Sequence, residues 1–144
     1  MNVVFRVMVL VAALAVGACA SLGSDEGSAT VTGRAIYPLH RPLPPNSVLR
    51  VQLLDVSRQD VRPQLISETT IPLEGKHPPI AFSLTYRLEA IKPSHAYSAR
   101  ATISVGNRLL FTTTQSYPVI TRNAPTDISV HLHPVGAGAT EHNR

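Results

Sequence analysis

Cys19 has the clearest chemistry in the chain, because it is the single cysteine among 144 residues. A thiol can be a nucleophile, a metal ligand or a site of alkylation, and its surroundings decide which. The uncharged apolar segment 7–16 precedes it, followed by the small residues Gly17 and Ala18. This apolar segment is shorter than the roughly 20 residues that cross a bilayer, and the pattern is typical of a secretory signal peptide. We therefore expect residues 1–18 to be a cleaved signal peptide.

The placement of Cys19 directly after Gly17 and Ala18 resembles the lipobox of bacterial lipoproteins. By that resemblance the thiol receives diacylglycerol, the peptide is cut before Cys19, and the new amino group receives an acyl chain such as palmitate. Several chains anchor a protein stably, since each buried methylene contributes about 0.8 kcal/mol. Ala20 in place of an aspartate favours the outer membrane, with the domain facing the periplasm. The alternative is a chance cysteine at the end of an ordinary signal peptide or membrane anchor, which would leave a reactive free thiol.

Composition divides the remaining chain into three parts. Residues 19–28 are rich in serine, glycine and acidic residues, and they predict a flexible linker after the lipidated cysteine. Residues 29–134 have the apolar patterns of one folded domain, large enough to bury a core without a disulfide. Residues 135–144 are small and polar and predict a disordered tail. The 13 basic and 9 acidic residues are scattered, so we expect no nucleic-acid partner.

Strand signals dominate the domain. Ile80, Phe82 and Leu84 alternate with small or polar residues, as in a strand buried on one face. The doublet Leu53 and Leu54 interrupts such an alternation and predicts a β-bulge. We expect strands at 30–37, 48–56, 65–71, 80–87, 97–104, 108–114 and 127–133. About seven short strands separated by proline and glycine turns favour an all-β, immunoglobulin-like sandwich.

Tyr97 supports the immunoglobulin-like arrangement over a closed barrel. It begins the strand predicted at 97–104 and follows a crossover segment, 91–96, that contains Pro93. This is where a tyrosine corner lies, with the hydroxyl bonded back to nearby backbone. We therefore assign Tyr97 a structural role.

Six histidines raise the question of a metal site. His131 and His133 are two residues apart on a predicted strand, so they share a face and could bind a metal together. A third ligand would have to come from a loop, from His40, His77 or His95. No cysteine or paired acidic ligand accompanies them, which favours the reading that they are outward polar residues.

No catalytic set stands out. The chain has no Gly-x-Ser-x-Gly motif and no close carboxylate pair, so we expect neither an enzyme nor a small-molecule substrate. We expect no cofactor besides the diacylglycerol and N-acyl lipid on Cys19. Aromatic residues are few, and there is no tryptophan, which weakens a role in glycan binding. Tyr37 and Tyr117, each beside a proline, are the aromatic side chains that we expect to be available for surface contacts.

Five segments, taken together and in this order, carry a family resemblance. They are LPPNSVLRVQLLDVS at 43–57, and the shorter runs 79–82, 91–93, 97–101 and 109–113. They resemble the YbaY-type envelope lipoproteins, a family that includes the YscW-type lipoprotein chaperones, or pilotins, of type III secretion. The resemblance implies a single β-sandwich on a lipid anchor, without catalytic residues. For pilotins it implies binding to the C-terminal tail of a secretin, which they escort to the outer membrane.

These observations predict an outer-membrane lipoprotein that presents a non-catalytic binding or assembly module to the periplasm. We expect its partners to be the membrane, through the lipid, and an envelope protein or peptide, which could add as a strand along a sheet edge. Two alternatives remain open at this point. One is a pilotin for a secretin, and the other is a metal- or glycan-handling accessory factor of the envelope.

Overall fold

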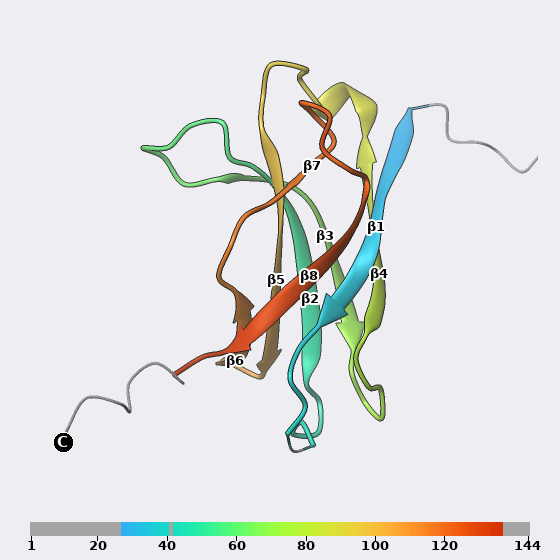
Figure 1. Cartoon of the computed structure of the whole chain (residues 1–144), viewed down its shortest axis with the longest axis vertical. Helices are drawn as coiled ribbons and strands as arrows, with labels where there is room; N and C mark the ends of the chain where they lie inside the picture. The colour runs from blue at the N-terminus through green and yellow to red at the C-terminus, as the bar shows by residue number, and fades with distance from the viewer. Residues whose placement is uncertain (1–26, 41, 137–144) are drawn as a thin grey trace, which may run out of the picture.

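A computed structural model describes residues 27–40 and 42–136 (Figure 1). The predicted signal peptide, Cys19 and most of the predicted linker and tail lie outside these residues. The described part contains eight strands and one short 3₁₀ helix: β1 (Ser28–Ile36), β2 (Val48–Asp55), β3 (Gln64–Pro72), β4 (Ile80–Arg87), η1 (Leu88–Ala90), β5 (Tyr97–Val105), β6 (Arg108–Thr113), β7 (Tyr117–Val119) and β8 (Asp127–Pro134). The predicted all-β class is confirmed. None of the helical structure in these residues is long and apolar enough to cross a membrane.

The strands form one continuous sheet in the order β3-β2-β5-β6-β8-β1-β4, with the short β7 paired to β5. Neighbouring strands are antiparallel except β1 and β8, which are parallel. The sheet curls until its two edge strands approach each other, and there the Ser67 hydroxyl donates a hydrogen bond to the Thr85 carbonyl at 2.6 Å. The result is a barrel-like sheet.

This architecture corrects the expected immunoglobulin-like sandwich of about seven strands. Strand β8 pairs with β1 through its first part, Asp127 to His131, and with β6 through its last part, Leu132 to Pro134. One strand therefore joins the two halves that would otherwise be separate sheets. The eighth strand, β7, has three residues, too few for an alternation to be recognised in the sequence.

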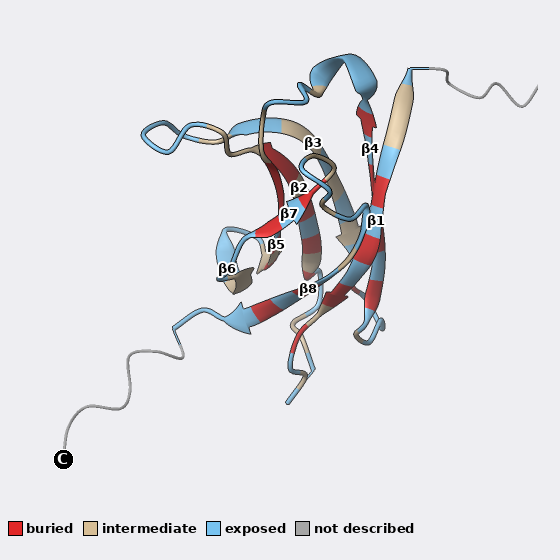
Figure 2. Ribbon diagram, turned by 45° about the horizontal axis from the view of Figure 1, so that its top comes forward, coloured by how far each residue is buried: buried red, intermediate tan, exposed pale blue. Residues whose placement is uncertain are grey.

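Buried residues alternate with exposed ones along the strands, as the red and pale blue bands of the ribbon show (Figure 2). On β4 the residues Ile80, Phe82 and Leu84 are buried and their neighbours are exposed. Burial of one such side chain stabilises the fold by about 1.5–3 kcal/mol. The predicted bulge is confirmed, because the register between β2 and β3 shifts between Leu53 and Leu54. The shift allows both of these consecutive leucines to be buried.

Gly33 marks a close approach of three strands. It lies on β1 between Phe82 of β4 and Ile128 of β8. A Cβ atom at this position would overlap the Ile128 carbonyl oxygen and lie 2.7 Å from the Phe82 ring. Glycine is therefore required here so that β1 can pack between its two neighbours.

Candidate partner-binding site

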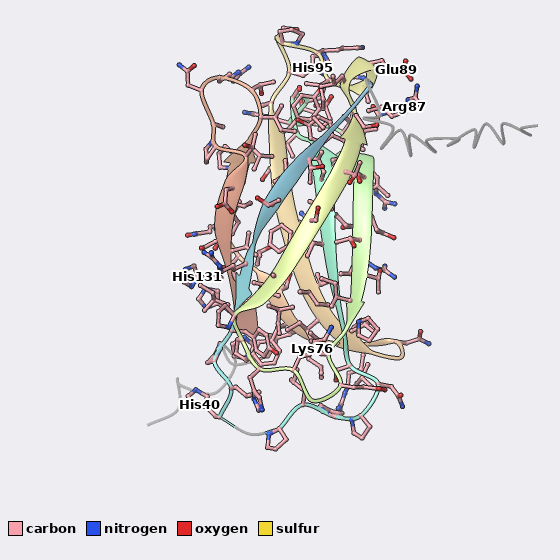
Figure 3. The ribbon with its side chains drawn as sticks, turned by 90° about the vertical axis from the view of Figure 1, so that its right-hand side faces the viewer. His40, Lys76, Arg87, Glu89, His95 and His131 are labelled. Carbon is pink, nitrogen blue, oxygen red and sulfur yellow. The ribbon has the colours of Figure 1, made fainter. Side chains whose placement is uncertain are left out.

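The barrel-like sheet has two different ends. Figure 3 shows His95, Arg87 and Glu89 at one end and His40 and Lys76 at the other. We call the first the His95 end, made of η1 and the loops 56–63, 91–96 and 120–126. We call the second the proline end, made of the loops 37–47, 73–79 and 106–107 and the last residues of β8.

The proline-rich loop is held firmly against its neighbour. Its prolines exclude both helix and central strand, so the chain bends between β1 and β2. The buried Ser47 hydroxyl donates a hydrogen bond to the Pro44 carbonyl at 2.7 Å. The Ser47 carbonyl in turn accepts the Leu73 N–H at 3.0 Å, which ties this loop to the loop 73–79. Leu39 and Leu43 pack partly on the core.

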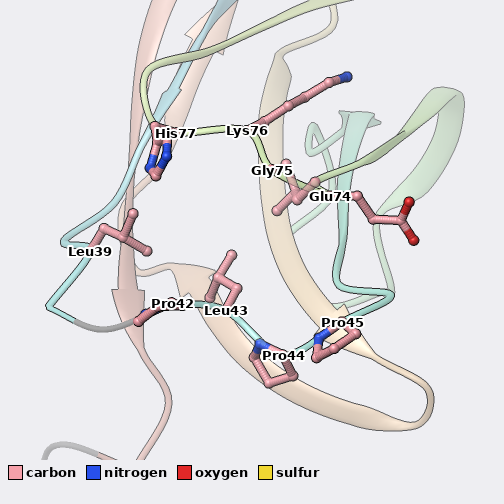
Figure 4. A pocket seen from close by; sticks show the side chains of 10 residues that line it. Leu39, Pro42, Leu43, Pro44, Pro45, Glu74, Gly75, Lys76 and His77 are labelled. Carbon is pink, nitrogen blue, oxygen red and sulfur yellow. The ribbon is translucent and has the colours of Figure 1, made fainter.

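One hollow lies between these two loops and has a volume of about 350 Å³. Leu39, Leu43 and the prolines Pro42, Pro44 and Pro45 line one side of it (Figure 4). The loop 73–79 lines the other side, and there the charged side chains of Glu74 and Lys76 point away from the hollow. The interior is therefore mainly apolar, with charges outside it.

A second, larger hollow of about 580 Å³ lies on the other side of the same loop. The segment 42–44 lines both hollows and forms a ridge between them. Phe111 and Val135 contribute apolar surface, and Arg108 and His40 contribute polar groups. Val135, which the sequence places in the tail, is 49% exposed, and its N–H donates to the Leu110 carbonyl at 2.9 Å. A pair of apolar hollows across one ridge can accept two neighbouring side chains of a partner.

Tyr37 and Tyr117 require a correction, because both are buried and neither is available for surface contacts. Each packs inward from a strand or strand end while its neighbouring proline is exposed. The centroid of the Tyr37 ring lies 5.5 Å from the centroid of the Phe111 ring. The Tyr117 hydroxyl accepts the His131 N–H at 2.7 Å and donates to the His131 carbonyl at 3.4 Å.

The Tyr37 hydroxyl is buried and has no hydrogen-bond partner among residues 27–40 and 42–136. Burial raises the pKa of this phenol. A buried polar group without a partner costs about 1–3 kcal/mol. The Tyr37 ring packs against Phe111, which lines the larger hollow.

The predicted metal ligands are not gathered into a site. His131 and His133 are exposed on β8, opposite Ile36 and Thr112. Figure 3 shows His40 and His95 at opposite ends of the molecule, with His131 between them. Across the described ranges, no three histidine, cysteine, aspartate or glutamate side chains are grouped closely enough to hold a metal ion. The geometry gives the metal hypothesis no support.

Tyr97 lies where the crossover segment enters β5. Its hydroxyl accepts the Lys92 N–H at 2.9 Å and donates to the Ala90 carbonyl at 3.4 Å. Its ring stacks near His95, with centroids 6.4 Å apart. These contacts fix η1 and the segment 91–96 to the core.

A polar network that was not foreseen from the sequence lies at the His95 end. Asp55 Oδ2 is 2.6 Å from His95 Nδ1, and Asp55 Oδ1 accepts both the Ser57 N–H at 2.9 Å and the Ser57 hydroxyl at 2.5 Å. The Ala96 N–H donates to Ser57 Oγ, and the Thr121 hydroxyl donates to the His95 carbonyl. Burial, the largest influence, raises the pKa of Asp55. The two hydrogen bonds from Ser57, together with the hydrogen bond and charge of His95, outweigh it and lower the pKa to about 2.

This network holds loops and does not form a nucleophile. The Ser57 hydroxyl donates to the carboxylate of Asp55, whereas a catalytic serine would donate to the histidine. The residues Asp55 and His95 are 40 positions apart. In the sequence, Asp55 reads as a contact that ends strand pairing and His95 as an ordinary turn residue, so nothing there joins them. The proline end is therefore the better candidate for partner binding.

The comparisons with known proteins define the class. The family model described as type III secretion system lipoprotein chaperone (YscW) matches residues 26–132, and the chain belongs to this family. The resemblance predicted from the five sequence segments is confirmed.

Two particular proteins are similar over most of the chain. The uncharacterized lipoprotein YbaY of Escherichia coli (strain K12) is 27% identical over an alignment of 154 residues. The alignment covers 94% of this chain and 80% of YbaY. The solved structure of an alternative pilotin from the type II secretion system of Vibrio cholerae is 35% identical, with a TM-score of 0.71. That likeness covers 75% of this chain and 97% of the pilotin.

Proposed function

We propose that this protein is a lipid-anchored, pilotin-like chaperone that binds a secretin and escorts it to the outer membrane. The observation that carries the proposal is the likeness to a solved pilotin along nearly that protein's whole length, at 35% identity. Membership of a lipoprotein chaperone family supports an envelope location and a non-catalytic role. No observation favours metal or glycan handling over this function.

Lipidation at Cys19 would place the domain close to the membrane. Residues 19–28 reach at most about 36 Å when fully extended. Strand β1 begins at the His95 end, so the linker joins the domain there and the proline end points away from the attachment (Figure 1). The hollows would then face the periplasm, where a newly exported secretin arrives.

The proline end has the chemistry to bind an apolar segment of that client. Apolar side chains of the client would fill the hollows on both sides of the ridge 42–44. The rim carries Arg108 and Lys76, and Glu74 is the one acidic side chain among the described lining residues. Acidic residues flanking the apolar segment would complement this rim.

Deletion of the gene in its host tests the function. We expect fewer secretin multimers in the outer membrane, with recovery from a wild-type copy. The variant Cys19→Ser serves as the matched control for the anchor: it should still bind secretin but fail to restore its localisation. Normal secretin multimers in the deletion strain would exclude the proposed function.

A matched pair of valines tests the site. Val135→Asp puts a charge into the larger hollow, and we expect at least about tenfold weaker secretin binding. Val61→Asp alters an equally exposed valine at the other end, 45% against 49%, and should leave the affinity unchanged. Both positions are exposed, so neither change should unfold the protein. Equal binding by the two variants would show that the client binds elsewhere.

A further inference from the structure

The sheet has one seam, between β3 and β4, where the barrel is not closed by a strand ladder. Each of these strands pairs on one side only, β3 with β2 and β4 with β1. In Figure 3 the two strands lie close at the His95 end and diverge toward the loop 73–79. An unpaired edge presents a row of N–H and C=O groups that can pair with another chain.

Two hydrogen bonds establish which groups of β4 face the seam. The Thr85 carbonyl accepts the Ser67 hydroxyl across the seam, so the main-chain groups of Thr85 point that way. Independently, the Thr32 N–H donates to the Thr126 carbonyl at 2.8 Å and thus points away from β4. Ser83 is the β4 partner of Thr32, and an antiparallel pair that does not exchange hydrogen bonds directs its groups outward.

Both observations select the same alternate residues of β4, because the main-chain groups of residues two apart in a strand point the same way. Ala81, Ser83 and Thr85 therefore direct their N–H and C=O groups into the seam. Of these, the Thr85 carbonyl is the group bonded to Ser67. The others are available for a further strand.

The β4 edge also lacks the usual protection against strand addition. Natural edges are blunted by lysine, proline, bulges or short length. Strand β4 is eight residues long, and the side chains of Ala81, Ser83 and Thr85 are exposed, small and uncharged. Nothing at these three positions repels an incoming strand.

The inner face of β3 is incompletely covered. Its residues Ser67, Thr69 and Ile71 pair with the fully buried residues of β2 and so face the same side, yet all three are only half-buried. Their side of the seam has less packed against it than the rest of the core. An added strand would cover them with its alternate side chains.

We propose that the seam between β3 and β4 receives an extended segment of the client as an added strand. The segment pairs with the main-chain groups of Ala81 and Ser83, and it displaces the Ser67–Thr85 hydrogen bond. Its chemistry follows from the seam: no proline at the pairing positions, and small or apolar side chains at every second residue, facing Thr69 and Ile71. The identity of the client rests on the proposed function.

The variant Ser83→Pro tests this directly. It removes an N–H that the fold itself does not use, and proline is tolerated at such edge positions. Ser83→Ala keeps the N–H and is the matched control. The probe is a synthetic peptide with the C-terminal tail of the host's secretin, added to the mature protein. We expect at least about tenfold weaker binding by Ser83→Pro, and Ser83→Ala within about twofold of wild type.

Amide hydrogen exchange of the wild-type protein gives a second readout that does not depend on the variant's fold. The amides of Ala81 and Ser83 should exchange quickly in the free protein and at least about tenfold more slowly with the peptide bound. Unchanged exchange would overturn the inference, even if Ser83→Pro proved unstable. Wild-type affinity in Ser83→Pro, with weakened binding in Val135→Asp, would also overturn it and leave the proposed function intact. Normal secretin multimers after gene deletion would instead remove the function.

Discussion

The two ends of the barrel-like sheet are built on opposite physical principles. At the His95 end, Asp55, Ser57, His95 and Thr121 bond three separate segments of chain to one another. At the proline end, Ser47 bonds the loop 37–47 to the loop 73–79, and the described residues leave two apolar hollows. The first end satisfies its polar groups internally, and the second leaves apolar surface for another molecule.

This difference fits a protein tethered at one end. Strand β1 starts at the His95 end, and the Gly27 carbonyl accepts the Leu88 N–H there at 2.8 Å. With the proposed lipid on Cys19, the firmly bonded end would be the one next to the tether. The opposite end would then be held away from the membrane, with its hollows accessible to the proposed client. We therefore expect that a substitution that loosens the loops at one end leaves the loops at the other end unchanged.

The largest effect should come from the sheet that both ends share. Gly33→Ala would force a Cβ into the Ile128 carbonyl and the Phe82 ring. We expect destabilisation of more than about 3 kcal/mol, or failure to fold, since backbone has to move. Urea unfolding measures it. Gly27→Ala is the control, because a Cβ there meets nothing within 4 Å. A small change in the free energy of unfolding for Gly33→Ala would mean that the two ends do not depend on a single rigid sheet.

The next effect should be confined to the His95 end and should depend on pH. Folding lowers the pKa of Asp55 from 3.8 to about 2, so the folded state binds fewer protons between these values. The resulting stability, about 2 kcal/mol, is complete above pH 4 and is lost as the pH falls through 2. The Asp55 side chain is 13% exposed, so solvent screening is small.

Unfolding of wild type and Asp55→Asn from pH 7 to pH 2 measures this contribution. The difference between the two proteins should shrink toward pH 2, where about half of the wild-type carboxylates are protonated. Secretin binding at neutral pH should be the same for both. Weaker binding by Asp55→Asn would show that the two ends are coupled.

Sequence patterns predicted the strands well but not their partners. Alternation places Ile80, Phe82 and Leu84 on one face whatever strand lies beside them, so β4 was correctly expected. The parallel pairing of β1 with β8 joins residues about 95 positions apart, as with Thr32 and Asp127, and no local pattern encodes it. The expected sandwich failed for that reason.

The candidate site was less predictable than the fold. Its hollows combine four separate segments of the chain, and residues such as Leu43, Gly75 and Val135 read separately as turn or tail residues. Tyr37 and Tyr117 were expected at the surface because of their neighbouring prolines, but Tyr37 packs inward just after β1 and Tyr117 packs inward from β7. The family resemblance indicated the class of partner, which no single residue does.

A matched pair of hydroxyls gives a smaller effect that separates the ends. Ser47 and Thr121 each donate to a backbone carbonyl at 2.7 Å, one at either end. Ser47→Ala and Thr121→Val should each lower the free energy of unfolding by about 1 kcal/mol. Only Ser47→Ala should weaken secretin binding, because it loosens a wall of the smaller hollow. Equal binding losses would contradict the assignment of the client to the proline end.

The smallest effect should come from the ion pair at the His95 end. Arg87 Nε lies 2.6 Å from Glu89 Oε1, but the two side chains are 70% and 71% exposed. Water and salt screen such a pair, so Glu89→Ala should change the free energy of unfolding by less than about 0.5 kcal/mol. Urea unfolding at low and high salt checks this. A loss above 1 kcal/mol that disappears in high salt would mean that surface charges, and not the bonds around Asp55, hold this end together.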